Sequence, residues 1–572
     1  MMTKQLLMTI SNNIFYHLRY SLIGIIALVG CSLQAQSSYF KNNEEVYEIV
    51  DRFQHQNLLS NDIHSSLRLY ARSKIFSKLM SIDTSALSSK YQYDLNYLLN
   101  DTIQPSTQRG LIKSIYQNPA HFLSYQSPSF EFVLNPILNF NLGHDLSEDQ
   151  FVFQNTRGIE LYGTLDKRLY FYTSFYENQS NFLSYITSSI ERDKAILGQG
   201  NYKDYQSSVI DAFQGYDYSN AQAYLGYKLT DHAILELGHG KHFIGNGMRS
   251  LLLSDIGHNY FYFKFRVEVW KLLYQSVISE LSGLSARFTP NNELLPKKYM
   301  ASHYLDLNIS DRLSIGLFES VIFSRENQFE LQYLNPLILY RTVEHGLDSP
   351  DNVLLGMNLS WRPIDGMSLY GQILIDELSL SELTSSEGWW GNKYGLQLGV
   401  KSFDFLGIDH LDTQVEFNMV RPYTYSHRIE LQGFEDYSIT SYSHNNQPLA
   451  HPLGANFNEI ILRIKYRLSN KLRSDIRYLY ARAGRNNDLN YGNNVLLNNS
   501  SRISDYGNAH LQGVSNNINM IDVHINYELF YKFFLDFNFR YRNDNNDESG
   551  QLNNNYFGFG IRYNVSVTQI DY

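Results

Sequence analysis

Three clusters of aromatic, amide and charged residues offer the clearest chemistry in this sequence. They comprise His242, Arg249 and Asp255; Trp389, Trp390 and Asn392; and Arg421, Tyr423, Tyr425, His427 and His444. Aromatic faces stack against sugar rings, and amide, carboxylate, guanidinium and imidazole groups hydrogen-bond to hydroxyls. These residues are therefore candidates for a polysaccharide-binding site. A second interpretation stays open, because Trp and Tyr also mark a lipid–water interface and inward arginines fill a lumen with paired charge.

The usual signatures of enzymes and cofactor sites are missing. The sequence has no Gly-x-Ser-x-Gly elbow, His-Glu-x-x-His pair or Walker loop. Gly245 and Gly247 resemble half of a dinucleotide loop, but no third glycine or βαβ context follows, and a tight turn where a strand enters a loop explains them better. His239 and His242 would lie on opposite faces of a strand, and adjacency of Ser254, Asp255 and His258 is not catalytic geometry. We expect no enzymatic activity, metal or cofactor.

The composition narrows the fold class before any element is assigned. Of 572 residues, 15% are aromatic and 18% charged, against roughly 25% charged in soluble proteins; the mean hydropathy is −0.33. Repeated apolar runs of about 20 residues, which a helical membrane protein needs, are missing, and the aromatic content excludes a disordered chain. A β-barrel, polar inside and apolar outside, satisfies both conditions.

The first 35 residues are typical of an export signal. Lys4 and Arg19 precede an apolar stretch from Leu22 to Leu33, and Ala35 offers a cleavage point. Removing residues 1–35 changes the net charge from −10 to −12, because they contain these two bases and no acid. Cys31, the only cysteine, also fits a lipoprotein box, so lipidation is an open alternative to removal. The acidic chain gives no electrostatic reason to bind nucleic acid.

Residues 36–109 are expected to form a small helical bundle. Val46, Ile49, Val50 and Phe53 have helical spacing between residues 43 and 59. A second helix is predicted from residues 61–62 through Leu67 and Tyr70 to residue 80, and a third is expected to open at residues 88–89. The bundle is either an ordinary helical cap or a periplasmic plug that docks a partner protein, for example of a motility machinery, through residues 43–100.

From residue 110 to residue 572 the hydrophobic period changes to two. Leu535, Phe537, Phe539 and Tyr541 alternate with polar residues, and the segments 460–468 and 414–419 follow the same pattern. A soluble sandwich would also alternate, but the export signal and the aromatic residues at the strand ends favour an outer-membrane barrel.

Four short polar turns predict the hairpins of this barrel. They lie at 165–169, 229–233, 309–313 and 468–472 and would face the periplasm. Candidate extracellular loops are 177–220, 378–392, 428–456, 484–518 and 543–555. The segment 556–565 is expected to be the closing strand, and the length permits an even number of strands between about 14 and 20.

Five segments together resemble a known family. They are 87–95 (LSSKYQYDL), 245–255 (GNGMRSLLLSD), 329–336 (FELQYLNP), 421–427 (RPYTYSH) and 447–456 (QPLAHPLGAN). The sequence is similar to the Wzi-like capsule-assembly family of outer-membrane barrels, and in particular to its Bacteroidetes branch, often labelled gliding-motility protein RemB.

The resemblance implies an antiparallel barrel of about 16–18 strands in the cell outer membrane, with a helical bundle at its periplasmic end. It also implies lectin-like binding of cell-surface polysaccharide in support of capsule or exopolysaccharide assembly, or of gliding motility. The alternative is an outer-membrane channel for small solutes, since the strands present a charged inner face.

Overall fold

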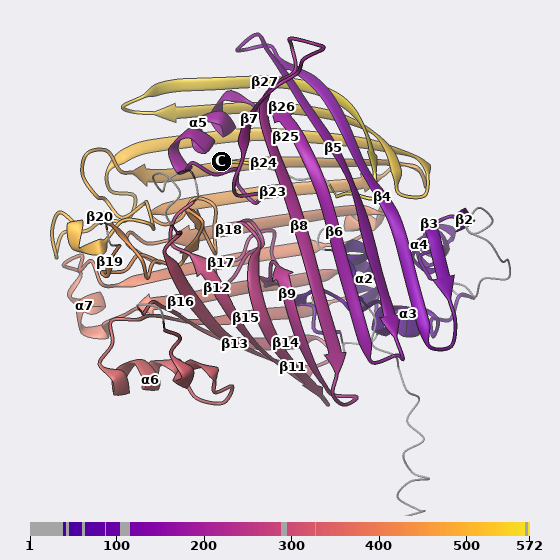
Figure 1. Ribbon diagram of the computed structural model, residues 1–572, viewed down its shortest axis with the longest axis horizontal. Helices are drawn as coiled ribbons and strands as arrows, with labels where there is room; N and C mark the ends of the chain where they lie inside the picture. Colours follow the sequence, from indigo (N-terminus) through magenta and orange to yellow (C-terminus); the bar gives the residue numbers. More distant parts are fainter. Residues whose placement is uncertain are drawn as a thin grey trace, which may run out of the picture. The chain divides into compact units, whose positions relative to one another are not determined.

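The computed structural model describes residues 38–41, 45–59, 63–85, 87–102, 115–285, 287, 294–325, 328–431, 433–566 and 570–572 (Figure 1). The expected signal and Cys31 lie outside these residues. Gln36–Tyr572 form one compact unit, in which three helices adjoin a large antiparallel barrel. Among the described residues, no helix is both long and apolar enough to cross a membrane.

Three helices form a head before the barrel: α2 (Glu45–His55), α3 (Arg72–Leu79) and α4 (Ser89–Leu99). Their apolar faces share one core, which includes Val50, Phe53 and Leu95. The side chain of Ser88 caps α4 by accepting a hydrogen bond from the Tyr91 amide (3.4 Å).

The predicted second helix is wrong in its first half. Leu67–Arg68 form a short strand, β1, that pairs with β10 (Phe243–Ile244), so only residues 72–79 are helical. The partner strand is more than 170 residues away in sequence, and helical spacing cannot reveal such a contact. This pairing joins the head to the segment 241–259.

Eighteen strands of the described chain form a closed antiparallel barrel. They are β4 (Phe130–Asp145), β5 (Gln150–Leu165), β6 (Leu169–Asn181), β8 (Gln214–Lys228), β9 (Ala233–Gly240), β11 (Tyr260–Val269), β12 (Leu272–Ser282), β13 (Lys297–Ser310), β14 (Leu313–Phe323), β15 (Asn352–Ile364), β16 (Met367–Glu377), β17 (Lys393–Ser402), β18 (Leu411–Val420), β23 (Phe457–Arg467), β24 (Leu472–Arg485), β25 (Val514–Phe530), β26 (Phe533–Asn546) and β27 (Gly550–Tyr563). β27 pairs with β4 and closes the ring, as predicted for the last strand.

Short strands and helices complete the structure. A hairpin of β2 (Ile115–Asn118) and β3 (His121–Gln126) pairs with the part of the β4 edge that β27 does not reach. The remaining elements are β7 (Lys203–Gln206), β19 (Glu430–Leu431), β20 (Phe434–Ser438), β21 (Ser443–His444), β22 (Gln447–Pro448), α5 (Ser184–Asp193), α6 (Tyr340–Leu347), α7 (Leu380–Ser385), and the 3-10 turns η2 (Leu331–Leu334), η3 (Phe405–Gly407) and η4 (Asn499–Ser501).

The alternation along the strands separates two faces, as predicted. On β26, Leu535 and Tyr541 are exposed on the outer side, whereas Asp536 and Arg540 form ion pairs inside the barrel with Arg562 (2.9 Å) and Asp522 (2.6 Å). An apolar outer surface around a polar interior is the organisation of outer-membrane barrels, and the protein accordingly belongs in the outer membrane.

The two ends of the barrel differ in the length of their connections. The four predicted hairpin turns are confirmed, and they lie at the end where the head sits, which by the general rule faces the periplasm. Long loops at the other end include the predicted 378–392. The prediction of a loop at 543–555 is wrong, because only residues 547–549 separate β26 from β27. The loops 241–259, 283–296 and 324–351 were not predicted.

The lumen is filled from both ends. From the periplasmic side, the head contributes ion pairs such as Asp51–Lys401 (2.8 Å) and Glu45–Arg473 (3.2 Å). From the extracellular side, the loop 421–456 folds inwards, and the fully buried Tyr425 and Tyr442 donate hydrogen bonds to the carbonyls of Leu251 and Leu252 (2.8 Å each).

Candidate functional site

The extracellular mouth brings together the loops 378–392, 421–456 and 486–513. Backbone hydrogen bonds join the first loop to the third: the Trp390 amide donates to the Asp505 carbonyl (2.9 Å), and the Gly507 amide donates to Glu387 (2.8 Å). Gly388 has a left-handed φ of +69°, and a β-carbon there would lie 2.9 Å from the Asn508 amide nitrogen. The glycine thus permits the close approach that fixes the two tryptophans.

Trp390 is the centre of a small aromatic and cationic cluster at the mouth. The Arg502 guanidinium carbon lies 4.1 Å from the centre of its ring, and the Lys393 ammonium lies at 5.5 Å. The ring of Tyr423 meets it edge-on at 6.2 Å, and Trp389 lies at the same centroid distance, tilted by 58°. Both tryptophans are half-buried, so part of each indole remains accessible to a ligand.

The positions of the four tryptophans distinguish two roles. Trp270 is 81% exposed in the β11–β12 turn, and Trp361 is 45% exposed near the end of β15, both beside the periplasmic turns. They occupy the position of an aromatic girdle. Trp389 and Trp390 instead lie on an extracellular loop and pack against another loop, so the girdle does not explain them.

Asn392 and Arg421 support this surface from below. The buried amide oxygen of Asn392 accepts a hydrogen bond from the Ser379 amide (3.0 Å), and its carbonyl accepts one from Arg421 Nε (2.9 Å). The Arg421 guanidinium also lies over the ring of Tyr394, 5.6 Å from its centre. These two residues position the loop through these contacts.

Tyr423 and Tyr425 are both only 1% exposed. Both adopt a positive φ, 65° and 73°, and the Tyr423 hydroxyl donates to the Asn490 carbonyl (2.8 Å). The Tyr425 amide donates to Asp376 (2.7 Å). Neither ring offers a free face to a sugar, and both tyrosines hold the loop that carries them inside the barrel.

His427 and His444 are also buried. His427 Nδ1 lies 3.2 Å from the Thr440 hydroxyl. His444 Nδ1 accepts from the Ser282 amide (2.9 Å) and its Nε2 donates to the Asn259 carbonyl (3.1 Å), which requires the neutral ring. Burial lowers the pKa of His444 to about 3, so the ring stays neutral.

The cluster of His242, Arg249 and Asp255 lies deep in the lumen and not at the mouth. His242 Nδ1 lies 3.1 Å from the Tyr260 hydroxyl. Arg249 is paired with Glu459 (3.2 Å) and with Asp571 (2.6 Å). Arg249 therefore fastens the segment 241–259 to the barrel wall and to the last residues of the chain.

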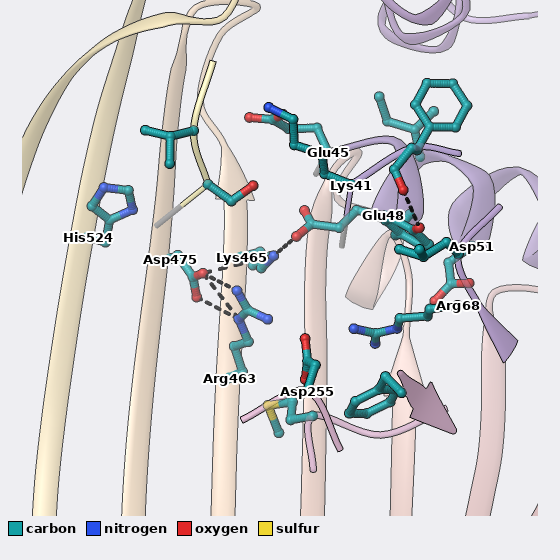
Figure 2. Close-up of a pocket in the computed structure, with 18 of the residues that line it drawn as sticks. Lys41, Glu45, Glu48, Asp51, Arg68, Asp255, Arg463, Lys465, Asp475 and His524 are labelled. Carbon is teal, nitrogen blue, oxygen red and sulfur yellow. Dashed lines mark hydrogen bonds and ion pairs between the residues drawn. The ribbon is translucent and has the colours of Figure 1, made fainter. Parts of the chain in front are cut away.

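Asp255 lines a cavity of about 580 Å³ between the head, the wall and the segment 241–259. Figure 2 shows its charged lining, in which Arg463 pairs with Asp475 (2.9 Å) and Lys465 pairs with Glu48 of α2. The cavity is separated in the fold from the tryptophans, which do not line it. Trp389 and Trp390 thus lie at the mouth, whereas Arg249 and Asp255 line this cavity.

Sequence reasoning missed the residues that complete the mouth. Arg502 and Asp505 form an ion pair (2.6 Å), and Tyr506 is 46% exposed in the same turn. The loop that carries them is rich in asparagine. The sequence could have identified this turn, because it has the same mixture of aromatic and planar polar side chains as the three clusters: Arg502, Asp505 and Tyr506.

Comparison with known proteins gives a structural match. The fold is similar to Wzi from Escherichia coli, an outer-membrane protein involved in group 1 capsule assembly and a carbohydrate-binding β-barrel, with a TM-score of 0.57, 13% identity, and coverage of 93% of this chain and 100% of that one. Pseudomonas aeruginosa OprD (TM-score 0.40, 11% identity, 77% and 96% coverage) and OpdK with vanillate (0.41, 10%, 76% and 98%) match less well. No protein-family model matches the sequence, and no curated protein matches it either. At this identity the likeness establishes a shared barrel fold.

Proposed function

We propose that this protein is a non-enzymatic outer-membrane barrel that binds cell-surface polysaccharide at its extracellular mouth. The observation that carries the proposal is the pair Trp389–Trp390, half-buried on a fixed loop, with Arg502 and Asp505 beside it. Accessible indole surface next to charged and amide groups is what recognition of a sugar requires. The carbohydrate binding of Wzi, which shares the fold, supports the same proposal.

The physiological output is a further part of the proposal. The motifs at 245–255 and 447–456 resemble the RemB-like branch, which supports a role in gliding motility, and the likeness to Wzi supports capsule or exopolysaccharide assembly. Deleting the gene, followed by capsule staining and a spreading assay on agar, separates these roles. Docking of a periplasmic or motility protein to residues 43–100 remains a prediction.

The alternative function, a channel for small solutes, has less support. The inner face is charged and encloses a cavity, but the head and the loop 421–456 occupy the lumen from opposite ends. A binding protein needs no open path, whereas a channel does.

Binding of the organism's own surface polysaccharide to purified protein tests the proposal. The double variant Trp389→Ala/Trp390→Ala is expected to lose binding. Trp270→Ala/Trp361→Ala is the matched control, since it removes two tryptophans from the other end of the barrel, and it is expected to bind normally. Failure of the wild-type protein to bind, or equal binding by both variants, contradicts the proposal.

A further inference from the structure

One extracellular loop folds outwards and not into the lumen. The segment 328–351, between β14 and β15, contains η2 and α6, and we call it the outer flap. Two of its residues, Tyr333 and Tyr340, are fully buried against the barrel wall. In Figure 1, α6 lies outside the barrel strands at the end opposite the head.

The register shows which face of the barrel the outer flap covers. Leu317 of β14 is 54% exposed, and the alternate residues Glu319, Val321 and Phe323 share its outward face. Val321 and Phe323 pack in one cluster with Tyr333, Tyr340 and Val343 of the flap, and with Ala301 of β13 and Val353 of β15. The flap thus lies on the surface that a membrane barrel presents to lipid.

Two ionisable residues lie beneath the flap on this outward face. His303 of β13 and Glu319 of β14 are register partners. The Tyr340 hydroxyl hydrogen-bonds to His303, and the Arg341 amide donates to Glu319 Oε1 (3.0 Å). Exposed to hydrocarbon, such side chains would be costly, so the first turn of α6 replaces lipid with hydrogen-bonding partners.

The height of this contact follows from strand geometry. His303 lies seven residues before Ser310, the last residue of β13, which is about 23 Å along the strand and roughly 18 Å above the periplasmic turn at a tilt of about 40°. The apolar band of such barrels is about 25 Å tall. The flap therefore lies at the level of the outer leaflet.

The outer surface of the flap combines apolar and polar residues. Leu331, Leu334, Leu337 and Leu339 are 71%, 44%, 88% and 64% exposed, while the exposed face of α6 carries polar residues that include Arg341 and His345. Irregular backbone is not tolerated in contact with hydrocarbon, but an amphipathic segment suits the boundary between headgroups and acyl chains.

We propose that the outer flap is a membrane anchor whose leucines contact outer-leaflet lipid at the headgroup–acyl boundary. Lipid is the occupant that the structure favours, because the leucines continue the lipid-facing surface formed by Leu317 and Leu355 on the strands beneath. The anchor fixes the height of one side of the barrel and does not depend on what the mouth binds.

Spin-label accessibility in the full chain tests this proposal. Leu337→Cys, made with Cys31→Ser, is labelled and reconstituted in phosphatidylcholine vesicles; Leu489→Cys, on the loop 486–513 and 50% exposed, is the matched control. At position 337 the label should collide more with oxygen than with a water-soluble nickel complex, and at position 489 the reverse should hold.

Two results overturn the proposal. If the nickel complex reaches position 337 as readily as position 489, the flap lies in water and not in lipid. Protection from both reagents means that protein covers it, which points to a second copy of the chain. Leu331→Cys, also at a strongly exposed leucine, gives an independent reading if the first variant does not fold.

Discussion

The guanidinium carbon of Arg502 lies 4.1 Å from the centre of the Trp390 ring, so a cation covers part of the indole. Arg502 Nε also donates to Asp505 (2.6 Å), whose backbone carbonyl accepts the hydrogen bond from the Trp390 amide. Arg502 and Asp505 thus connect the loop 378–392, which carries both tryptophans, to the loop 486–513. The proposed polysaccharide surface depends on this connection.

Arg502→Ala should weaken polysaccharide binding by roughly two- to fivefold, the equivalent of a cation–π contact of about 0.5–1 kcal/mol at a partly exposed site. Calorimetric titration of the purified protein measures this change. Arg312→Ala is the control, since Arg312 is an exposed arginine paired with Asp365 (2.7 Å) at the periplasmic end. An equal loss of affinity in both variants contradicts the assignment of the mouth.

The sequence predicted the barrel well because lipid and lumen impose opposite demands on successive residues. Successive residues such as Leu535 and Asp536 lie on opposite faces of a strand, so the apolar one faces lipid and the charged one faces the lumen. A short polar turn such as 468–472 between two such strands predicts a hairpin. The helices α2 and α4 were also predicted correctly, since their apolar spacing and the Ser88 cap are local signals.

Contacts between distant segments could not be predicted from a single sequence. Arg249 was a reasonable sugar-binding candidate until the fold placed Glu459 and Asp571 against it. Tyr425 was a candidate for the same reason, and the inward fold of its loop buried it. The outward fold of residues 328–351 could not be predicted either, because a segment rich in leucine is equally typical of a buried helix.

Asp94→Asn should loosen the head from the barrel. Asp94 is fully buried, receives hydrogen bonds from His410 Nε2 (2.8 Å) and Arg52 Nη1 (3.1 Å), and also pairs with Arg467. Removing its charge takes away the carboxylate that pairs with the buried Arg467, a loss of about 3–5 kcal/mol, whereas Arg52 keeps its ion pair with Asp412. Faster amide hydrogen exchange across α4 is the expected readout, and unchanged exchange contradicts it.

We expect the attachment of the head through Asp94 to depend on pH. Although burial acts to raise it, the pKa of Asp94 falls to about 2, because His410, Arg467 and Arg52 together stabilise the charged form. An aspartate in the unfolded chain has a pKa of about 3.9, so its contribution is complete above pH 4 and is lost as the pH falls towards 2. In the wild type, the protection of α4 from amide hydrogen exchange, corrected for the intrinsic exchange rate, should therefore fall between about pH 4 and pH 2. Asp94→Asn should lack this component, and identical profiles would contradict the argument.

The intact protein should show almost no conductance in planar bilayers, and removing residues 43–100 should not by itself open a wide pore. The reason is that Tyr425 and Tyr442 attach the loop 421–456 to the segment 241–259. Arg249 still holds this segment to Glu459 of the barrel wall when the β1–β10 pairing with the head is removed. Conductance should appear only when the loop 421–456 is shortened as well. A large conductance after deletion of the head alone would show that the head is the only barrier and would strengthen the channel hypothesis.

Asp571→Asn should destabilise the barrel although Asp571 lies in no strand. Its carboxylate is buried between Arg249 (2.6 Å) and Arg477 (2.6 Å), so it connects the segment 241–259, the strand β24 and the final residues of the chain inside the lumen. The neighbouring arginines hold its pKa well below the usual range, because they outweigh the burial that would raise it. The substitution removes the charge that both arginines share, and breaking a buried pair in this way costs about 3–5 kcal/mol.

The temperature at which the folded band disappears from a gel of the detergent-solubilised protein measures this effect. Asp365→Asn, at an exposed pair with Arg312, should leave that temperature unchanged, because solvent screens the interaction. If the folded band disappears at the same temperature in both variants, the argument is wrong. Glu459 would then suffice to hold Arg249, and Asp522 would suffice to hold Arg477, without the carboxylate of Asp571.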